Sequence, residues 1–167
     1  GIAIERRRLA TNLQQAEARF RALFEHNAVG IAQVDAAGRF LLVNARACQI
    51  LGRTPEDLVG RAFTEVTHPE DVQANVDLLQ RSLRSGDGYR LEKRYLRPDG
   101  AAVWASVDVR VVRKPDGEVD YLSAAIQDIS AAREAAQQLA AGEERYRRLL
   151  SDVRVIAWEA DAQTWQF

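Results

Sequence analysis

Alternating apolar and polar positions run through residues 89–126, and this pattern predicts three antiparallel strands in a row. The expected strands are Tyr89 to Leu96, Val103 to Val112 and Val119 to Ile126. A Pro-Asp-Gly turn follows each of the first two, in which Pro presets φ and Gly accepts a positive φ. A period of two places one face of such strands against a core and leaves the other face in water.

Two shorter apolar runs, Val29 to Val34 and Arg39 to Val43, predict a hairpin ahead of these strands. Helix-start signals follow the hairpin at Asn44, at Thr54-Pro55 and at His68-Pro69, where a capping side chain or a proline precedes acidic or apolar residues. The order is therefore two strands, several helices and three strands. It predicts an α+β domain with a five-stranded antiparallel sheet and its helices on one face.

Heptad spacing at both ends of the chain predicts flanking amphipathic helices. The first, from about Ile4 to His26, either lies on its own domain or pairs with a second copy. The second runs from Ile129 to Leu150 with one charged interruption at Glu143, and it could form a weaker seam. The expected homodimer seam of the first helix consists of Leu9, Leu13, Ala16, Phe20 and Leu23.

An internal repeat divides the chain further. Residues 17–24 match residues 143–150, and Val29 then matches Val155, so a second copy of the same unit is expected to begin near the C-terminus with its first strand. Both ends of the sequence read as cuts through a longer protein. The expected segments are 1–27 as an N-terminal helix, 28–128 as the core domain, 129–150 as a linker helix and 151–167 as the truncated start of a second domain.

Composition and charge exclude several classes of function. With 47% hydrophobic and 28% charged residues the chain is typical of globular proteins. Its net charge of −1 gives no basis for binding nucleic acid or an anionic membrane. The single cysteine excludes an internal disulfide, and with no apolar run long enough for a bilayer we expect a cytoplasmic location. No catalytic or metal-binding set has suitable spacing, so this fragment is not expected to be an enzyme.

Short segments with a characteristic order and spacing extend from Arg19 to Ser130. They are Gly30-Ile31-Ala32, Asp35 and Gly38, Val43-Asn44, Ile50-Leu51-Gly52, Leu58-Val59-Gly60, His68-Pro69-Glu70-Asp71, Glu92-Lys93-Arg94-Tyr95, Asp99-Gly100, Val103-Trp104 and Asp128-Ile129-Ser130. In this combination the chain resembles a PAS domain of the bacterial S-box type, with the start of a second PAS repeat at its C-terminus.

The resemblance implies a sensory module of a multidomain bacterial signalling protein. Such modules commonly precede a histidine kinase, diguanylate cyclase or phosphodiesterase output domain in the same polypeptide, in two-component or cyclic-di-GMP signalling. Asp128, Ile129 and Ser130 match the family segment that passes a signal from the last strand into the outgoing helix. Two functions stay open: binding a small ligand and relaying the change, or serving as a ligand-free dimerisation and spacer module in a PAS array.

The sequence does not identify a cofactor, and it disfavours both haem and flavin. Cys48 lies on a different helix from the cysteine of flavin-adduct sensors, His68 precedes a proline at a helix start, and Trp104 suits packing better than flavin stacking. The charged residues of the strand at 89–96 are interpreted as a solvated face. Either a solid core or a ligand pocket can form between sheet and helices. The candidate pocket residues are Ile31, Leu42, Cys48, Phe63, Val76, Leu79, Leu91, Trp104 and Ala124.

Overall fold

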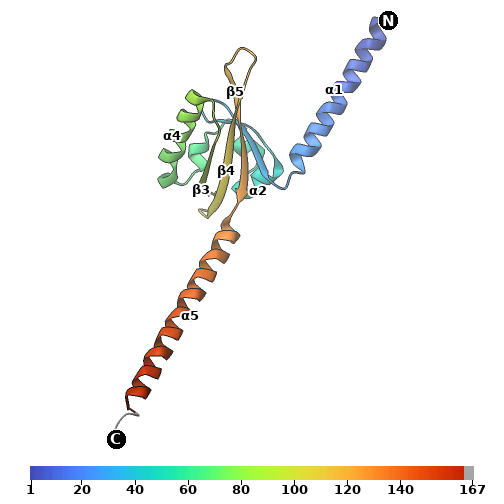
Figure 1. Cartoon of the computed structure of the whole chain (residues 1–167). Coiled ribbons are helices and arrows are strands. Elements are labelled where there is room, and N and C mark those ends of the chain that lie inside the picture. The colour runs from blue at the N-terminus through green and yellow to red at the C-terminus, as the bar shows by residue number, and fades with distance from the viewer. Residues whose placement is uncertain (164–167) are drawn as a thin grey trace. The chain divides into compact units, whose positions relative to one another are not determined.

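Five antiparallel strands form a single sheet in the computed structural model, which describes the backbone of residues 1–163 and the side chains of residues 1–151 (Figure 1). The order across the sheet is β2-β1-β5-β4-β3, so the last strand in sequence lies at the centre. The predicted α+β fold is confirmed. The strands are β1 (Gly30–Val34), β2 (Phe40–Val43), β3 (Tyr89–Leu96), β4 (Ala102–Arg113) and β5 (Val119–Asp128).

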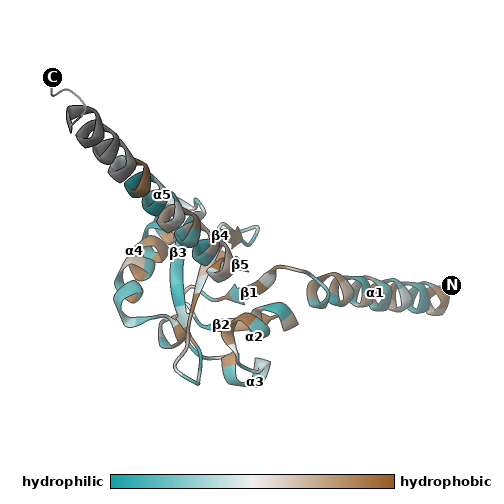
Figure 2. Ribbon diagram, turned by 90° about the horizontal axis from the view of Figure 1, so that it is seen from below, coloured by the Kyte–Doolittle hydropathy of each residue, from teal (hydrophilic) through white to brown (hydrophobic). Residues whose placement is uncertain are grey.

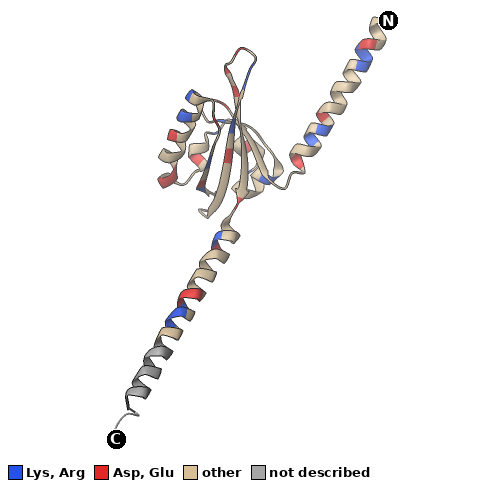
Figure 3. Ribbon diagram, viewed as in Figure 1, with Lys and Arg blue, Asp and Glu red and all other residues tan. Residues whose placement is uncertain are grey.

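Four helices connect β2 to β3, and the three α-helices among them begin where the sequence predicts. The Asn44 side chain accepts from Ala47 N at the start of α2, and Thr54 caps α3, which has Pro55 at its first position. Acidic residues lie at the start of α4 and basic ones at its end, which suits the helix dipole (Figure 3). The 3₁₀ helix η1 was not predicted. These helices are α2 (Ala45–Leu51), α3 (Pro55–Leu58), η1 (Phe63–Val66) and α4 (Pro69–Ser85).

The hydrophobic core lies between the sheet and these helices. In β4 the buried side chains alternate with half-buried ones, so Val103, Ala105, Val107 and Val109 all face the core. The β4–β5 ladder continues this layer through Leu122, Ala124 and Ile126. From the helical side Leu51, Leu58 and Leu79 close the core.

A buried asparagine ties the first helix, α1 (Ile2–Glu25), to the β1 and α2 side of the domain. Asn44 is fully buried, and its Oδ1 accepts from Ile31 N at 2.8 Å and from Ala47 N at 2.9 Å. Its Nδ2 donates to Phe24 O at 2.9 Å and Val29 O at 3.0 Å. Both lone pairs and both N–H groups of the amide are therefore used. This side chain holds three elements together without leaving a polar atom unsatisfied.

The chain divides into two compact units, Gly1–Ile129 and Ser130–Phe167. The second unit contains one helix, α5 (Ser130–Gln163). A strand was expected to begin at Val155, as the internal repeat predicted, but the helix runs through this position. A lone strand has no sheet to supply hydrogen bonds, whereas a helix satisfies its backbone internally. Whether 151–167 begins a second domain stays a prediction, and residues 164–167 lie outside the described residues.

Among the described residues, no helix combines the length and apolar character needed to cross a bilayer.

Candidate ligand cavity

A small cavity of about 30 Å³ lies between the sheet and α4, next to η1. Most of its wall is aliphatic or aromatic, and four side chains with polar groups reach it, one from α4 and three from β3. The lining residues are Val34, Phe40, Phe63, Asn75, Leu79, Tyr89, Lys93, Tyr95, Val107, Val109, Ala124 and Ile126.

Lys93 places a primary amine in the wall of this cavity. The residue is 2% exposed, and its cross-strand neighbour on β4, Ala105, is fully buried as well. Nζ lies 4.3 Å from the ring centroid of Tyr95 and 5.0 Å from that of Phe63. These ring faces attract a cation. Burial nevertheless lowers the pKa of Lys93 from 10.5 to about 7, and only the charge of Asp71 opposes this shift.

Three neutral polar groups connect Lys93 to α4, to η1 and to the start of β3. Nζ donates to Asn75 Oδ1 at 2.7 Å and to Thr67 Oγ1 at 3.0 Å. The Thr67 hydroxyl donates onward to Phe63 O at 2.8 Å, and Asn75 Nδ2 donates to the Tyr89 hydroxyl at 3.2 Å. Burial raises the pKa of Tyr89, so its phenol stays protonated at neutral pH. The result is a buried polar cluster of Lys93, Asn75, Thr67 and Tyr89, which we call the Lys93 cluster.

An ion-pair clamp holds α4 against β3 beside this cluster. Arg94 Nη2 lies 2.7 Å from Asp71 Oδ1 and 2.7 Å from Glu70 Oε2, and the backbone N of Arg94 also donates to Asp71 Oδ2 at 2.8 Å. The hydrogen bond from Arg94 lowers the pKa of Asp71. Lys93 and Arg94 are adjacent on a strand and point to opposite faces, so β3 carries the cavity amine on one face and the clamp on the other.

The structure brings only part of the predicted pocket together. Phe63, Leu79 and Ala124 line the cavity. Cys48, Val76 and Leu91 pack partly buried against the core without lining it, and half-buried Leu42 does not reach it. Ile31 and Trp104 alternate with buried neighbours and therefore lie on the opposite face of the sheet, where Arg94 stacks 5.3 Å from the Trp104 ring. For these two positions the predicted strand phase was wrong by one residue.

The sequence interpretation missed the Lys93 cluster because β3 carries a run of charged residues. Figure 2 shows this strand as hydrophilic, and Lys93 was read as part of a solvated face. The position of Lys93 in the strand could have indicated its burial. One face of β3 carries Tyr89, Leu91, Lys93 and Tyr95, and Tyr95 is 2% exposed. The burial of Asn75 could also have been predicted, because this residue lies on the apolar stripe of α4 beside Val76 and Leu79.

The cavity does not fit a large cofactor. Pockets for ligands of that size usually measure about 300 Å³ or more, roughly ten times the volume found here. His68 caps α4, with Nδ1 accepting from Glu70 N, and does not line the cavity. Burial raises the pKa of the Cys48 thiol, and nearby Glu25 and Glu56 add to the effect, so its reactive thiolate form is disfavoured. Among the described residues, no cluster of metal-binding side chains is found.

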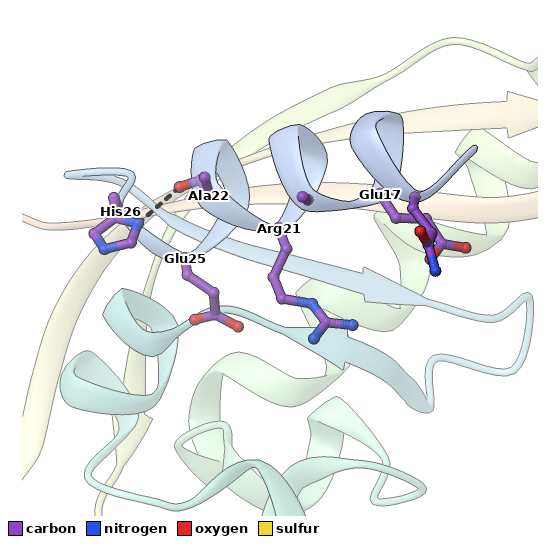
Figure 4. A pocket seen from close by; sticks show the side chains of 7 residues that line it. Glu17, Arg21, Ala22, Glu25 and His26 are labelled. Atoms are coloured by element: carbon purple, nitrogen blue, oxygen red, sulfur yellow. Dashed lines mark hydrogen bonds between the residues drawn. The ribbon is translucent and has the colours of Figure 1, made fainter. Parts of the chain in front are cut away.

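A larger hollow of about 500 Å³ follows the surface of α1, but it is an open groove on one helix. Its lining residues come from that helix and its C-cap His26, and Figure 4 shows Glu17, Arg21 and Glu25 projecting from the helix as separate side chains. His26 Nδ1 lies 2.9 Å from Ala22 O, within the same turn. This groove has no facing wall to remove a ligand from water, so the cavity between the sheet and α4 is the better candidate site.

Comparison with known proteins agrees with this geometry. The family model described as "PAS fold" matches residues 18–129. The probable diguanylate cyclase DgcE of Escherichia coli (strain K12) is 37% identical over 121 residues, covering 71% of this chain and 11% of that protein. The sensor histidine kinase TmoS of Ectopseudomonas mendocina is 30% identical over 128 residues, covering 76% of this chain and 13% of that protein.

The chain thus spans only about an eighth of the length of these relatives. Among solved structures, the PAS domain of an HTR-like protein from Haloarcula marismortui superposes with a TM-score of 0.62 at 29% identity. It covers 74% of this chain and 99% of the matched one. The strand order, the helices between β2 and β3 and the matched range lead to one conclusion: the chain belongs to the PAS family.

Proposed function

We propose that this chain is a sensory module of a multidomain bacterial signalling protein. In this role a change in the cavity alters the sheet, and the change passes through Asp128, Ile129 and Ser130 into α5 and on to an output domain. Membership of the PAS family supports the proposal, as does its similarity to a sensor histidine kinase and to a probable diguanylate cyclase. Such a protein would work in the cytoplasm, and catalysis would belong to its output domain: a histidine kinase, a diguanylate cyclase or a phosphodiesterase.

The position of β5 is the observation that carries this proposal. Ala124 and Ile126 on this strand line the cavity, and α5 begins at Ser130, only a few residues further along the chain. The strand also pairs with both β1 and β4, so it is held on both edges. Ile129 N donates to Trp104 O at 2.9 Å, which fixes the last residue before α5 to the sheet. A displacement of β5 therefore has a short covalent route into the helix.

A change of helix register tests this relay. Two residues inserted into the parent protein after Ala136 rotate everything beyond them by roughly 200°, whereas seven inserted residues restore the phase to within about 20°. We expect the two-residue insertion to lock or abolish the regulated output and the seven-residue insertion to preserve it. The measurement is kinase, cyclase or phosphodiesterase activity of the parent. Equal activity of both insertions and the wild type would contradict a relay through α5.

A second candidate function, a dimerising spacer, is supported by the apolar stripe on α1. Leu9, Leu13, Phe20 and Leu23 are between 55% and 75% exposed, and Ala16 lies exposed between them. Large apolar side chains repeated at heptad spacing are typical of helices that pair with a second copy. The homodimer would then form through the predicted seam of Leu9, Leu13, Ala16, Phe20 and Leu23, whether or not the cavity binds a ligand.

Charged substitutions in the seam test this second function. Leu13→Asp combined with Phe20→Asp should give a folded monomer, because two carboxylates on each helix would face their counterparts across the seam. The matched control is Gln14→Asp with Ala18→Asp, which adds the same charge at exposed positions outside the stripe. Sedimentation velocity gives the oligomeric state. An unchanged dimer in the seam variant, or loss of the dimer in the control, would contradict pairing through this seam.

A further inference from the structure

Lys93 is a buried amine whose hydrogen bonds and ring contacts among the described residues are all to neutral groups. Its two hydrogen-bond acceptors are an amide oxygen and a hydroxyl, and its other close contacts are the faces of Phe63 and Tyr95. None of the ion pairs found among the described residues involves Lys93. A buried charge is unfavourable unless a partner of opposite charge compensates it. Among the residues whose side chains the structure describes, the protonated amine therefore has no counter-ion in direct contact.

The Lys93 cluster also contains more donors than acceptors. A protonated lysine has three N–H groups, and only two of them meet an acceptor. The Tyr89 hydroxyl accepts from Asn75 Nδ2, and in the described part of the chain its own proton has no acceptor. The Thr67 hydroxyl donates its hydrogen bond to Phe63 O. One N–H of Lys93 and the O–H of Tyr89 therefore have no acceptor among the described residues. Both residues line the same cavity.

A carboxylate is the group that complements this set. It brings one negative charge and two acceptor oxygens, whereas a water molecule would satisfy the donors without balancing the charge. The amide of Asn75 already contacts Lys93 through its oxygen and Tyr89 through its nitrogen. A carboxylate has the same planar shape as an amide, so it can bridge the same two residues from the cavity side. The remaining wall, with Val107 and Ile126, suits a short aliphatic group.

We propose that the cavity binds a small carboxylate, with one oxygen accepting from Lys93 Nζ and the other from the Tyr89 hydroxyl. This proposal rests on the proposed sensory function and names the class of ligand that the module would detect. The volume of about 30 Å³ limits the ligand to the size of formate or acetate, unless side chains of α4 move outward.

Protonation of Lys93 links this binding to pH. The groups facing the amine are the amide of Asn75, the hydroxyls of Thr67, Tyr89 and Tyr95 and, at longer range, the carboxylate of Asp71. Burial raises the pKa of Tyr95, so this phenol stays neutral across the useful range. With the pKa of Lys93 at about 7 in the free protein, a bound carboxylate takes up a proton at higher pH. Affinity should therefore fall about tenfold for each pH unit above 7.

The composition of the chain permits a direct test, because Lys93 and Lys114 are its two lysines and Lys114 is exposed. Lysine labelled with ¹³C at Cε gives one NMR signal for each residue. Formate and acetate are titrated against sodium chloride of equal ionic strength. We expect a saturable shift of the Lys93 signal, an increase in its apparent pKa by about one unit or more, and no saturable change at Lys114. A Lys93 signal that does not saturate through the millimolar range, or that changes as Lys114 does, would overturn the proposal.

Two variants sharpen the test. Tyr89→Phe removes one donor and should weaken acetate binding about tenfold, as expected for a hydrogen bond to a charged group. Lys93→Met should abolish the increase in melting temperature that acetate gives the wild type, whereas Lys114→Met should retain it. If Lys93→Met fails to fold, the wild-type titration and Tyr89→Phe still decide the matter. Unchanged acetate affinity in Tyr89→Phe would contradict the bridging geometry.

The register insertions separate this proposal from the proposed function. They act on α5 in the parent protein and need no ligand, so they report on the relay alone. Absent carboxylate binding with intact register dependence would overturn the ligand class and leave the sensory function standing. Carboxylate binding without register dependence would overturn the relay through α5 and leave the ligand class standing.

Discussion

The two ends of the sheet each bury a polar side chain, and they treat it in opposite ways. At the β1 and α2 end, Asn44 is neutral and makes four hydrogen bonds to backbone groups. At the β3 and α4 end, Lys93 carries a titratable amine beside a cavity and contacts only neutral groups. A satisfied neutral group of this kind stabilises a structure, whereas an incompletely matched charge next to a cavity makes the structure responsive to protons and anions. If the proposed carboxylate binding is correct, the first end supplies rigidity and the second end supplies sensitivity.

The largest expected effect comes from removing Asn44. Asn44→Ala leaves two carbonyl oxygens and two N–H groups without partners, and we expect a loss of about 3–5 kcal/mol in the free energy of unfolding. Urea denaturation measures this change. Asn44→Asp keeps the two accepted hydrogen bonds but turns a carboxylate toward Phe24 O and Val29 O, and should also destabilise the protein. A loss below about 1 kcal/mol in Asn44→Ala would contradict its structural role.

The pH dependence of stability should distinguish the Lys93 end. The unfolded chain binds the lysine proton with a pKa of 10.5, whereas the folded chain binds it with a pKa of about 7. Between these values unfolding takes up a proton, so the free energy of unfolding rises with pH by up to about 1.4 kcal/mol per unit. Below pH 7 both states are protonated and this contribution is flat.

Urea denaturation from pH 6 to pH 9 checks the direction of the effect. Lys93→Met should remove the rise and Lys114→Met should keep it. If the free energy of unfolding of the wild type follows the same pH dependence as that of Lys93→Met over this range, burial does not lower the pKa of the amine.

The clamp between α4 and β3 should contribute less. Asp71→Asn removes the charge that pairs with Arg94 while keeping the size of the side chain, and we expect a loss of about 1–2 kcal/mol at neutral pH. Because Arg94 lowers the pKa of Asp71 in the folded state, the wild type should lose this contribution as the pH falls through that lowered value. Denaturation at several acidic pH values compares the two proteins. Parallel curves for wild type and variant would argue against the clamp.

The smallest effect should come from filling space, and its sign should differ between the two ends. Ala124→Val adds two methyl groups to a residue that lines the cavity, and should stabilise by about 0.5–1 kcal/mol while reducing acetate affinity. The matched change, Ala47→Val, lies in the close-packed end, where α2 approaches Gly30, and should destabilise by about 1–3 kcal/mol. Thermal unfolding measures both. Equal destabilisation by the two changes would mean that the cavity has no usable space.

The two ends of the sheet also differ in how far their buried polar residues can be predicted from the sequence. Asn44 directly precedes a short helix, where asparagine is a preferred cap, so its hydrogen bond to Ala47 N follows from local rules. Its bonds to Ile31, Phe24 and Val29 join residues 13 to 20 positions away and do not follow from such rules. The turns that end the first two long strands are equally local. Lys93 could not be assigned by such rules, because a charged run is usually solvated and its burial depends on which face of β3 the helices cover. The same uncertainty of phase misplaced Ile31 and Trp104, since a shift of one residue exchanges the two faces of a strand.

The pairing of β1 with β5 has a mechanical consequence. Gly30, where the chain joins the sheet, is paired with Ile126, close to where the chain leaves it. The two strands are antiparallel, so tension applied to the ends of the unit Gly1–Ile129 pulls on the same end of one ladder. Its hydrogen bonds are then loaded one after another, as in unzipping, and do not share the load as they would in shear. The unit should therefore yield first where its two ends enter and leave the sheet, and a pulling experiment should open this ladder at low force.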